Sequence, residues 1–378
     1  MVDRKEINKA LEKINKEFHK GTKEEKPIAF IAADRPDLIT AEYYPTGITV
    51  LDEALGGGVP LGAVTTVHGT PFSGKTSLAL TVAARLTKEQ KYVIYLNLEG
   101  IKLDTFKLFG IDMNYMVEIS AMDFAEQNID AVTQLMYDKE TRTPKNLVSA
   151  IIIDSLNNLY TKVQVDNIEE DGFASNGQMA RRAKLIDDFL TMIYGRGVLR
   201  DGLMILAITQ DRANISGAGK GAPTIMSCGE SLKFNSKVTI KLSRKPQKAR
   251  INGIERVIGH TVTFDISKNS IFGNVGKGEY SVIYGQGIDD SVALFDKALS
   301  EDWGYIIKPD RSNYRFILPI GDINVKGKDA AIGIIKAHPE VAQELRRLLM
   351  GPKPKPLPVS VGFDYVFKGE EVADESEE

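Results

Sequence analysis

The chain has 378 residues, of which 43% are hydrophobic and 26% are charged. These proportions are typical of a globular protein, and they exclude a wholly disordered chain, a collagen-like chain and a small disulfide scaffold. The 48 basic and 51 acidic residues give a formal net charge of -3. This near balance argues against a nucleic-acid binder only if the charges are evenly spread, which a whole-chain sum does not show.

Several residue patterns limit where the protein works. No apolar run approaches the roughly 18 residues that span a bilayer, and the charged N-terminus contains no secretory apolar stretch. The single cysteine, Cys228, has no partner for an internal disulfide, which fits a reducing compartment. The four histidines lack partners at metal-site spacing, so we expect no structural zinc. We therefore expect a soluble, cytoplasmic protein without membrane contact.

The first segment has the spacing of an amphipathic helix that stops near Gly21. Lysine and glutamate occupy its remaining faces. The apolar stripe either covers the protein's own core or docks on another subunit, and periodicity does not choose between these. The stripe consists of Ile7, Ala10, Leu11, Ile14 and Phe18.

Short apolar, β-rich runs then alternate with helical stretches such as the one over 77–86. This alternation predicts βαβ units, and hence an α/β fold with a mainly parallel twisted sheet covered by helices. The runs over 237–243, 261–267 and 280–284 have no helices between them and predict an antiparallel extension of that sheet. The parallel strands are predicted over 63–68, 93–98, 150–154 and 203–209.

The C-terminal quarter differs in pattern from the rest. Beyond Gly285 and Gly287, helices over 291–300 and 329–350 flank a short region over 305–318, which predicts a small α+β domain. Alternating prolines then predict a stiff linker before an acidic tail. Residues 351–378 hold three lysines and seven acids, so the remainder of the chain sums to +1.

The strongest local motif is a glycine-rich loop between the first parallel strand and a helix. Its glycines allow successive backbone N–H groups to face phosphate oxygens. We expect Lys75 to reach the β- and γ-phosphates of ATP, and the hydroxyl of Thr76 to bind Mg²⁺. The alternative is a chance glycine turn before a helix, which explains the full order of strand, loop, lysine and helix less well than a phosphate-binding loop does. The expected nucleotide-binding residues here are Gly69, Thr70, Pro71, Phe72, Ser73, Gly74, Lys75, Thr76 and Ser77.

Polar side chains end three other apolar strands. Asp154 is a candidate second carboxylate for the magnesium shell, although acids after strands are also common turn residues. Glu99 either polarises the attacking water or is a solvated loop acid. Gln210 has an amide that can contact a γ-phosphate. Because the carboxyl ends of parallel strands share one edge of a sheet, we expect these three residues to converge on the phosphate loop.

Together with several further segments, these residues resemble the RecA-type recombinases of bacteria and phages, including UvsX-like phage proteins. The similar segments keep the family's order over roughly 3–350, whereas a generic P-loop protein would match only the phosphate loop. They are the lead-in over 44–62, the segments over 229–234, 266–270 and 284–288, and a stretch over 11–21 that is similar to the family's polymerisation helix.

The resemblance implies a RecA-like P-loop core with an N-terminal polymerisation helix and a small α+β C-terminal domain. The expected units are the helix and linker over 1–28, the ATPase core over 29–285, the C-terminal domain over 286–350, and the proline-rich linker with acidic tail over 351–378.

The resemblance also implies roles in catalysis beyond that of Lys75. Glu99 matches the glutamate that activates water. Gln210 matches the glutamine that senses the γ-phosphate and signals to a DNA-binding loop. Lys268 matches a lysine that reaches the γ-phosphate of the neighbouring subunit, where it would stabilise transition-state charge as an arginine finger does.

Two positions depart from the family's pattern. Ser270 replaces a second lysine of this kind. The segment after Glu99 is one residue shorter, so Thr105 or Phe106 stands where an aromatic would stack on adenine, and Phe106 is the aromatic candidate.

The family's two DNA-binding loops correspond to 162–176 and 211–226. The first is acidic, but Arg181 in the following helix aligns with a backbone-contacting arginine. The second is rich in glycine and small residues. An ordinary surface loop is the alternative there, but the direct connection to Gln210 favours a loop ordered by γ-phosphate contact. Ile225 or Met226 would wedge between bases.

The most basic stretch of the chain is 233–260, with eight lysines and arginines against one acid. A solvated charged face is the ordinary interpretation, but the stretch falls where the family has a secondary strand-binding site, and binding there would depend strongly on salt. The DNA-binding candidates of the whole chain are Arg181, Arg212, Lys220, Ile225, Met226, Arg244 and Lys245.

These observations predict a DNA-dependent ATPase that uses ATP and Mg²⁺, forms helical filaments on single-stranded DNA and exchanges strands with homologous double-stranded DNA. Single-strand-binding and mediator proteins are further expected partners. The alternatives are a hexameric helicase or other motor with the same fold, and a non-hydrolysing accessory protein. The acidic tail is expected to compete with DNA for the basic stretch.

Overall fold

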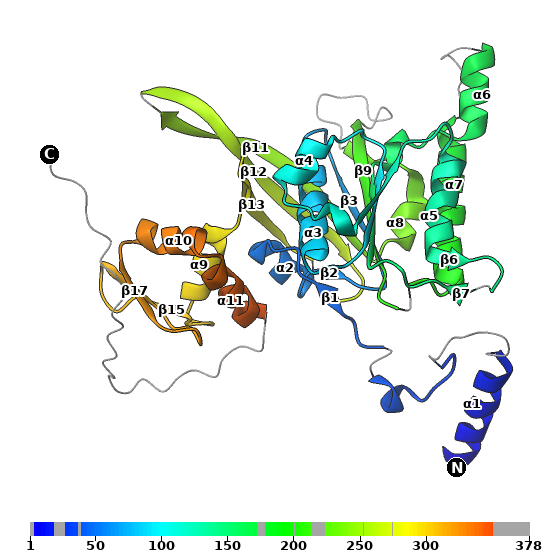
Figure 1. Ribbon diagram of the computed structural model, residues 1–378, viewed down its shortest axis with the longest axis horizontal. Helices are drawn as coiled ribbons and strands as arrows, with labels where there is room; N and C mark the ends of the chain where they lie inside the picture. The colour runs from blue at the N-terminus through cyan, green and yellow to red at the C-terminus, as the bar shows by residue number, and fades with distance from the viewer. Residues whose placement is uncertain are drawn as a thin grey trace.

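Figure 1 shows the computed structural model, with labels on many of the elements described below. It describes residues 4–18, 27–36, 39–141, 143–171, 178–199, 201–213, 224–251, 253–273 and 275–350. Within these ranges, no helix combines the length and the apolar character needed to cross a membrane.

A ten-stranded sheet forms the centre of the molecule, in the order β14-β13-β12-β11-β3-β9-β8-β4-β5 with β10 paired to β9. Neighbouring strands run parallel from β11 to β5 and antiparallel from β11 to β14. The mainly parallel sheet and its antiparallel extension are thereby confirmed. The bounds are β3 (Val64–Gly69), β4 (Val93–Asn97), β5 (Met116–Ser120), β8 (Ala150–Asp154), β9 (Met204–Ala213), β10 (Thr224–Met226), β11 (Val238–Ile251), β12 (Ile254–Asn269), β13 (Lys277–Ile283) and β14 (Gly287–Asp289).

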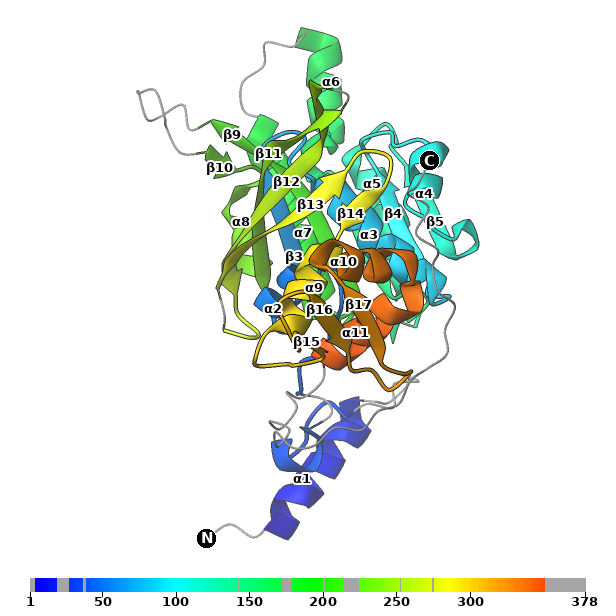
Figure 2. The same ribbon diagram turned by 90° about the vertical axis from the view of Figure 1, so that its left-hand side faces the viewer.

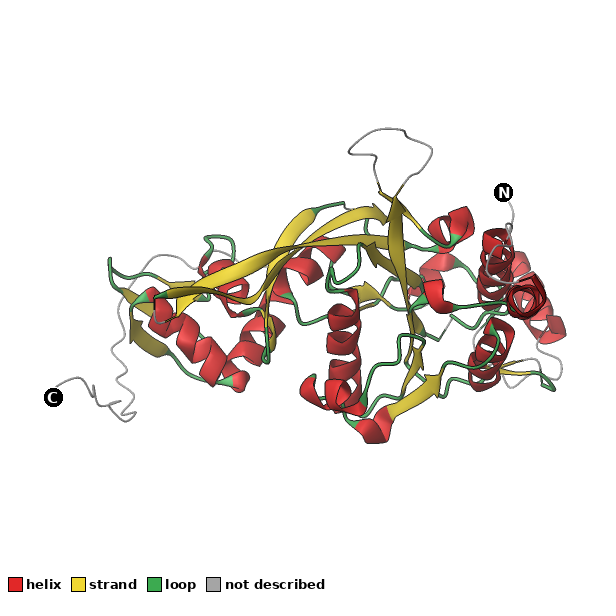
Figure 3. Ribbon diagram, turned by 90° about the horizontal axis from the view of Figure 1, so that it is seen from above, coloured by secondary structure: helices red, strands yellow, loops and turns green. Residues whose placement is uncertain are grey.

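Helices cover both faces of this sheet because its central strands are apolar on both sides. Every residue of β3, β4 and β8 is buried. One face packs against α2 (Thr49–Leu55), α3 (Lys75–Lys88) and α4 (Leu103–Leu108), and the other against α5 (Ala125–Met136), α7 (Gln178–Gly195) and α8 (Gly229–Asn235). Figure 3 distinguishes the helices from the strands by colour.

Shorter elements connect these layers. They are η1 (Ala32–Asp34), β1 (Tyr43–Tyr44), β2 (Val59–Pro60), η3 (Met113–Tyr115), β6 (Tyr137–Asp138), β7 (Thr143–Pro144), η4 (Leu156–Asn158) and α6 (Lys162–Asp171).

Strands β11 and β12 continue far past the sheet as a two-stranded arm. β11 pairs with β3 only from Val238 to Leu242, whereas its pairing with β12 runs on to Ile251. Figure 1 shows the arm projecting at the upper left. The sequence predicted strands that stop at 243 and begin at 261, because the arm is rich in lysine and arginine and lacks the apolar alternation of a buried strand.

The C-terminal residues form a separate hydrophobic cluster. Its elements are α9 (Ser291–Leu299), β15 (Ile306–Ile307), β16 (Asn313–Phe316), β17 (Ile323–Lys326), α10 (Lys328–Ala337) and α11 (Pro339–Met350). The sequence predicted one helix over 329–350, which is wrong. Pro339 has no backbone N–H for an α-helical bond, so the chain breaks at His338 and Pro339 begins a new helix.

Helix α1 (Arg4–Phe18) lies apart from the sheet in both Figure 1 and Figure 2. Its contacts within the described residues include bonds from Asn15 to the backbone of Ile28 and Ala29 and an ion pair between Arg4 and Asp34. Ile7 and Ile14 remain 43% and 37% exposed. The apolar stripe of this helix therefore does not cover the protein's own core.

Candidate nucleotide and DNA site

The phosphate loop joins the end of β3 to the start of α3. Gly69 is required there because a Cβ atom would lie 2.2 Å from the carbonyl oxygen of Leu242. Gly74, at φ +97°, is the N-cap of α3 in a left-handed conformation that favours glycine. The loop between them reaches solvent at Thr70, Pro71 and Phe72. The helix N-terminus and the backbone N–H groups of the loop are thus available to an anion.

Lys75 lies inside this loop with only 7% of its surface exposed. Its Nζ donates to the carbonyl oxygens of Gly69 at 3.2 Å and Thr70 at 2.8 Å. Burial lowers the pKa of Lys75, and the negative charges of Asp154, Glu99 and Asp211 oppose that shift. A buried ammonium held by loop carbonyls is suited to exchange them for phosphate oxygens.

Asp154 is 1% exposed and lies beside the first turn of α3. The hydroxyl of Tyr95 donates to its Oδ2 at 2.8 Å, while its Oδ1 is buried without a hydrogen-bond partner among the described residues. Burial raises the pKa of Asp154 to about 6, and hydrogen bonds from Tyr95 and Thr76 oppose this rise. An unsatisfied carboxylate oxygen next to the Thr76 hydroxyl is the donor set that Mg²⁺ prefers, so these residues fit the ion.

Glu99 and Gln210 meet at the carboxyl edge of the sheet. The Ser155 hydroxyl donates to Glu99 Oε1 at 2.7 Å, and Gln210 Nε2 donates to the same oxygen at 3.3 Å. The neighbouring order of β4, β8 and β9 causes this meeting, because Glu99 and Ser155 follow β4 and β8 while Gln210 lies within β9. The structure therefore brings together the phosphate loop, Asp154, Glu99 and Gln210.

Lys268 lies at the opposite edge of the sheet. Lys268 pairs with Thr239 on β11, and Thr239 pairs in turn with Thr66 on β3. Because Thr66 lies three residues before Gly69, Lys268 is displaced by about 10 Å along the strand direction from the phosphate loop. Its Nζ donates to the carbonyl oxygens of Lys233 at 2.9 Å and Phe234 at 3.0 Å. Burial, with the charges of Lys237 and Lys233, lowers its pKa.

Phe106 does not form a stacking surface for adenine, contrary to the expectation from the sequence. It is 3% exposed and packs edge-on against Tyr95, with ring centroids 5.3 Å apart. The helical spacing of α4 turns this side chain into the core, whereas the neighbouring Thr105 is half-buried. Sequence position alone did not show which way the residue faced.

The first expected DNA-binding loop is a helix over all of its described length. Residues 162–171 form α6, and the rest of the loop lies outside the described residues. Arg181, in the first turns of α7, is exposed. Its neighbour Arg182 is buried, with its guanidinium 5.2 Å from the ring centroid of Tyr160.

The second expected DNA-binding segment is the root of a hairpin. Strand β9 continues past Gln210 and pairs with β10, so that Arg212 lies opposite Ile225; Figure 2 shows the two strands side by side. Arg212 is exposed, whereas Met226 packs against the second hydrophobic cluster. Lys220 lies outside the described residues. Gln210 is thus connected to the hairpin by an unbroken strand.

Arg244 and Lys245 are exposed at the root of the β11–β12 arm. The guanidinium of Arg244 lies 5.4 Å from the ring centroid of Phe72, which is 79% exposed in the phosphate loop. This part of the basic stretch therefore borders the nucleotide site.

Asn157 was not identified from the sequence. Its Oδ1 accepts from the backbone N–H of Gln210 at 2.7 Å and from the hydroxyl of Thr209 at 2.9 Å. It therefore fixes the backbone at Gln210 from η4, which follows β8, the strand next to β9. The only sequence signal for Asn157 is that it is polar and comes shortly after a strand that ends in a site residue. Many loop residues share this signal.

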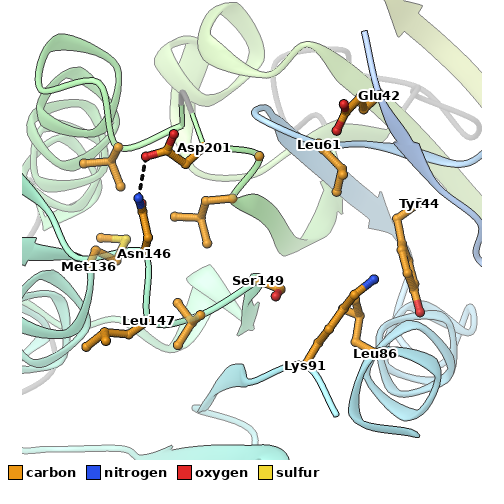
Figure 4. A pocket seen from close by; sticks show the side chains of 14 residues that line it. Glu42, Tyr44, Leu61, Leu86, Lys91, Met136, Asn146, Leu147, Ser149 and Asp201 are labelled. Atoms are coloured by element: carbon orange, nitrogen blue, oxygen red, sulfur yellow. Dashed lines mark hydrogen bonds between the residues drawn. The ribbon is translucent and has the colours of Figure 1, made fainter. Parts of the chain in front are cut away.

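A cavity of about 240 Å³ lies at the amino edge of the sheet and is drawn in Figure 4. Its lining includes Ser149 and Leu203, which precede β8 and β9, and Leu61, which precedes β3. Asn146 Nδ2 donates to Asp201 at its rim at 2.6 Å. Because the phosphate loop follows the carboxyl end of β3, this cavity is not the nucleotide site.

Comparison with known proteins agrees with this arrangement. A family model described as RecA N-terminal domain matches residues 5–289. Protein RecA of a Nitratiruptor species is 30% identical over 345 residues, which cover 90% of this chain and 91% of that protein. Protein RecA of Campylobacter lari is 27% identical over 99% of this chain and 98% of that protein. These relatives do not support the helicase and accessory-protein alternatives. The chain therefore belongs to the RecA family of recombinases.

Proposed function

We propose that the chain is a DNA-dependent ATPase that forms helical filaments on single-stranded DNA and pairs them with homologous duplex DNA in the cytoplasm. The observation that carries this proposal is the hydrogen bond between Gln210 and Glu99. It joins the candidate catalytic base to the strand that leads into the β9–β10 hairpin. Nucleotide chemistry and DNA contact would then share one structural element.

The nucleotide site is proposed to act through five side chains. The phosphate loop and Lys75 bind the triphosphate, and Glu99 removes a proton from the attacking water. The Thr76 hydroxyl and the Asp154 carboxylate would hold Mg²⁺, which would supply positive charge to offset the charge of the phosphate oxygens. The Ser155 hydroxyl keeps Glu99 Oε1 in place.

Gln210 is proposed to report the γ-phosphate to DNA. Its amide bonds Glu99 at 3.3 Å, which is longer than an ordinary hydrogen bond and so is readily exchanged for a phosphate oxygen. The strand after it carries Arg212 and pairs with β10 in the β9–β10 hairpin, while Lys220 lies outside the described residues. A shift at Gln210 would move this hairpin, where Ile225 and the two cations contact the DNA strand.

Lys268 is proposed to serve the nucleotide of a neighbouring subunit. Its place at the opposite edge of the sheet keeps it from its own phosphate loop. Its lowered pKa reflects a partly desolvated ammonium among other cations, which a phosphate would stabilise. Each ATP would then bridge two protomers.

Helix α1 is proposed to dock on the next protomer. Its apolar stripe exposes Ile7 and Ile14, and its described contacts do not cover them. Burial of these side chains against another copy would contribute roughly 1.5–3 kcal/mol each. Together with Lys268 this gives a head-to-tail contact, which propagates into a helix.

Strand exchange tests the proposal as a whole. We expect the wild-type chain, with ATP and Mg²⁺, to exchange single strands with a homologous duplex and not with a heterologous one. We expect single-stranded DNA to stimulate ATP hydrolysis, and Glu99→Gln to reduce the stimulated rate about 10²- to 10⁴-fold. Glu279→Gln, at an exposed position on β13, is the matched control and should hydrolyse ATP normally. Undiminished hydrolysis in Glu99→Gln would refute the assignment of the base.

A further inference from the structure

A buried carboxylate connects three neighbouring strands directly behind the phosphate loop. The Asp211 side chain is 0% exposed, and its Oδ1 lies 2.6 Å from Nδ1 of His68. Because a carboxylate only accepts, His68 Nδ1–H is the donor. Lys241 Nζ lies 3.8 Å from Oδ2 of the same group. One residue each from β3, β9 and β11 thus forms a compact charged group, which we call the Asp211 cluster.

The Asp211 cluster lies on the other face of the sheet from the nucleotide. Along β9, Leu206 and Ile208 pack in the cluster of the α3 face, whereas Ile205 and Ala207 pack in that of the α7 face. Side chains alternate along a strand, so Gln210 points to the nucleotide face and Asp211 to the α7 face. Adjacent residues therefore face the two sides of the sheet.

Each partner of Asp211 is placed next to a functional segment. His68 immediately precedes Gly69, which pairs with Gln210. Asp211 itself pairs with Met226 at the base of the β9–β10 hairpin. Its negative charge also raises the pKa of Lys75, although burial dominates that shift. The Asp211 cluster thus touches the phosphate loop through the backbone and the hairpin through the β9–β10 ladder.

We propose that Asp211 is a positioning residue that couples the phosphate loop to the β9–β10 hairpin, with His68 as its principal partner. This rests on the proposed role of Gln210 as the residue that responds to nucleotide. When the Gln210 backbone shifts, a buried carboxylate bonded to His68 and close to Lys241 keeps β3, β9 and β11 together at this level of the sheet. The shift of the Gln210 backbone then moves the β9–β10 hairpin, because the strands cannot slide past one another to accommodate it.

The physical basis is the cost of separating the partners. A buried carboxylate that loses its donors is strongly destabilised, so the His68–Asp211 contact resists opening. Asparagine at 211 keeps the size of the side chain but removes its charge. The attraction to Lys241 is then lost and the bond to His68 becomes a weaker, neutral one. We expect the strands to stay paired but to slip more easily at their ends.

Hydrogen exchange of the full-length protein tests the proposal without DNA. The amides of residues 204–213 and 224–228 are followed with and without Mg²⁺ and a non-hydrolysable ATP analogue. In the wild type, nucleotide should slow their exchange. In Asp211→Asn this slowing should shrink about 2- to 30-fold, the range over which single residues change coupling. The affinity for a fluorescent ATP analogue should change less than about threefold, since Asp211 is expected not to touch the nucleotide.

A double-mutant cycle separates coupling from simple loss of structure. His68→Asn, Asp211→Asn and the double variant should lose the same degree of protection, because each breaks the same contact. Lys241→Gln provides a milder variant, since that side chain is 41% exposed and tolerates change. Asp296→Asn is the matched control, because it breaks an exposed 2.8 Å ion pair with Lys328 between α9 and α10, outside the sheet that holds this cluster.

The outcomes are distinct. Equal loss in the single and double variants, with Asp296→Asn behaving like the wild type, supports the coupling. Additive losses, or nucleotide-dependent protection in both Asp211→Asn and Lys241→Gln equal to that of Asp296→Asn, would overturn it. A wild-type chain without nucleotide-dependent protection would overturn it as well. DNA-stimulated ATP hydrolysis and strand exchange decide the proposed function independently of these results.

Discussion

Replacing Asp154 with asparagine should stabilise the nucleotide-free protein while removing its response to Mg²⁺. The carboxylate is 1% exposed, and one of its oxygens has no hydrogen-bond partner among the described residues. The charge of Asp154 therefore lowers the free energy of unfolding, and we expect the protein to retain it because the carboxylate is needed to hold Mg²⁺. Asparagine occupies the same volume without that charge, and its carbonyl oxygen still accepts from Tyr95.

The magnitude follows from the pKa. Burial raises the pKa of Asp154 from 3.8 to about 6, so the folded protein holds this proton more tightly than the unfolded chain. Stability from this group is fully present below pH 3.8 and is lost as the pH rises through 6. At about 1.4 kcal/mol per pKa unit, the ionised group costs roughly 3 kcal/mol at pH 7.5 and about half of that at pH 5.

Urea unfolding followed by far-ultraviolet circular dichroism measures this difference. Fluorescence is less suitable because the single tryptophan, Trp303, packs in the C-terminal cluster. We expect Asp154→Asn to exceed the wild type by about 1–3 kcal/mol at pH 7.5, and by less at pH 5. Mg²⁺ with ATP should raise the Tm of the wild type only. The surface control Asp265→Asn should change stability by less than about 1 kcal/mol. A variant no more stable than the wild type at pH 7.5 would refute the reasoning.

Four further outcomes are expected. Gln210→Ala should bind ATP normally but lose stimulation by single-stranded DNA; retained stimulation would remove its signalling role. Lys268→Ala and Lys75→Ala should each be inactive in ATP hydrolysis. If Lys268 acts across a head-to-tail interface, an equimolar mixture of the two variants should regain activity at about a quarter of the nucleotide sites, those that combine an intact Lys75 with an intact Lys268 from the neighbour. No recovery would argue that Lys268 acts within one subunit. Deleting residues 1–21 should abolish filaments in electron micrographs without weakening nucleotide binding, and unchanged filament length would exclude docking by α1. Deleting residues 360–378 should strengthen duplex binding at moderate salt, and an unaltered salt dependence would exclude competition by the acidic tail.

The sequence by itself determined the features that local order encodes. The phosphate loop requires a strand, a fixed glycine spacing and a helix in succession, and all of them lie within about 25 residues. Apolar runs of the right length likewise predicted β3, β4, β8 and β9 and the side chains that follow them. The α/β class of the fold followed from these signals, because few architectures accept alternating strands and helices in which the strands are buried on both faces. The RecA-like core was implied by the resemblance of several segments to the family.

The tertiary structure decided which residues face each other across the sheet. Gln210 reaches Glu99 over a separation of 111 residues, and Asp211 reaches His68 over 143. Periodicity gives a side chain a face but no partner, so it missed the Asp211 cluster. Periodicity also ended β11 early, because a charged two-stranded arm is held by its ladder of backbone bonds and not by apolar burial. The family resemblance placed Phe106 at the adenine site, but this side chain packs in the core. Partner choice depends on the strand order, and only the folded chain fixes that order.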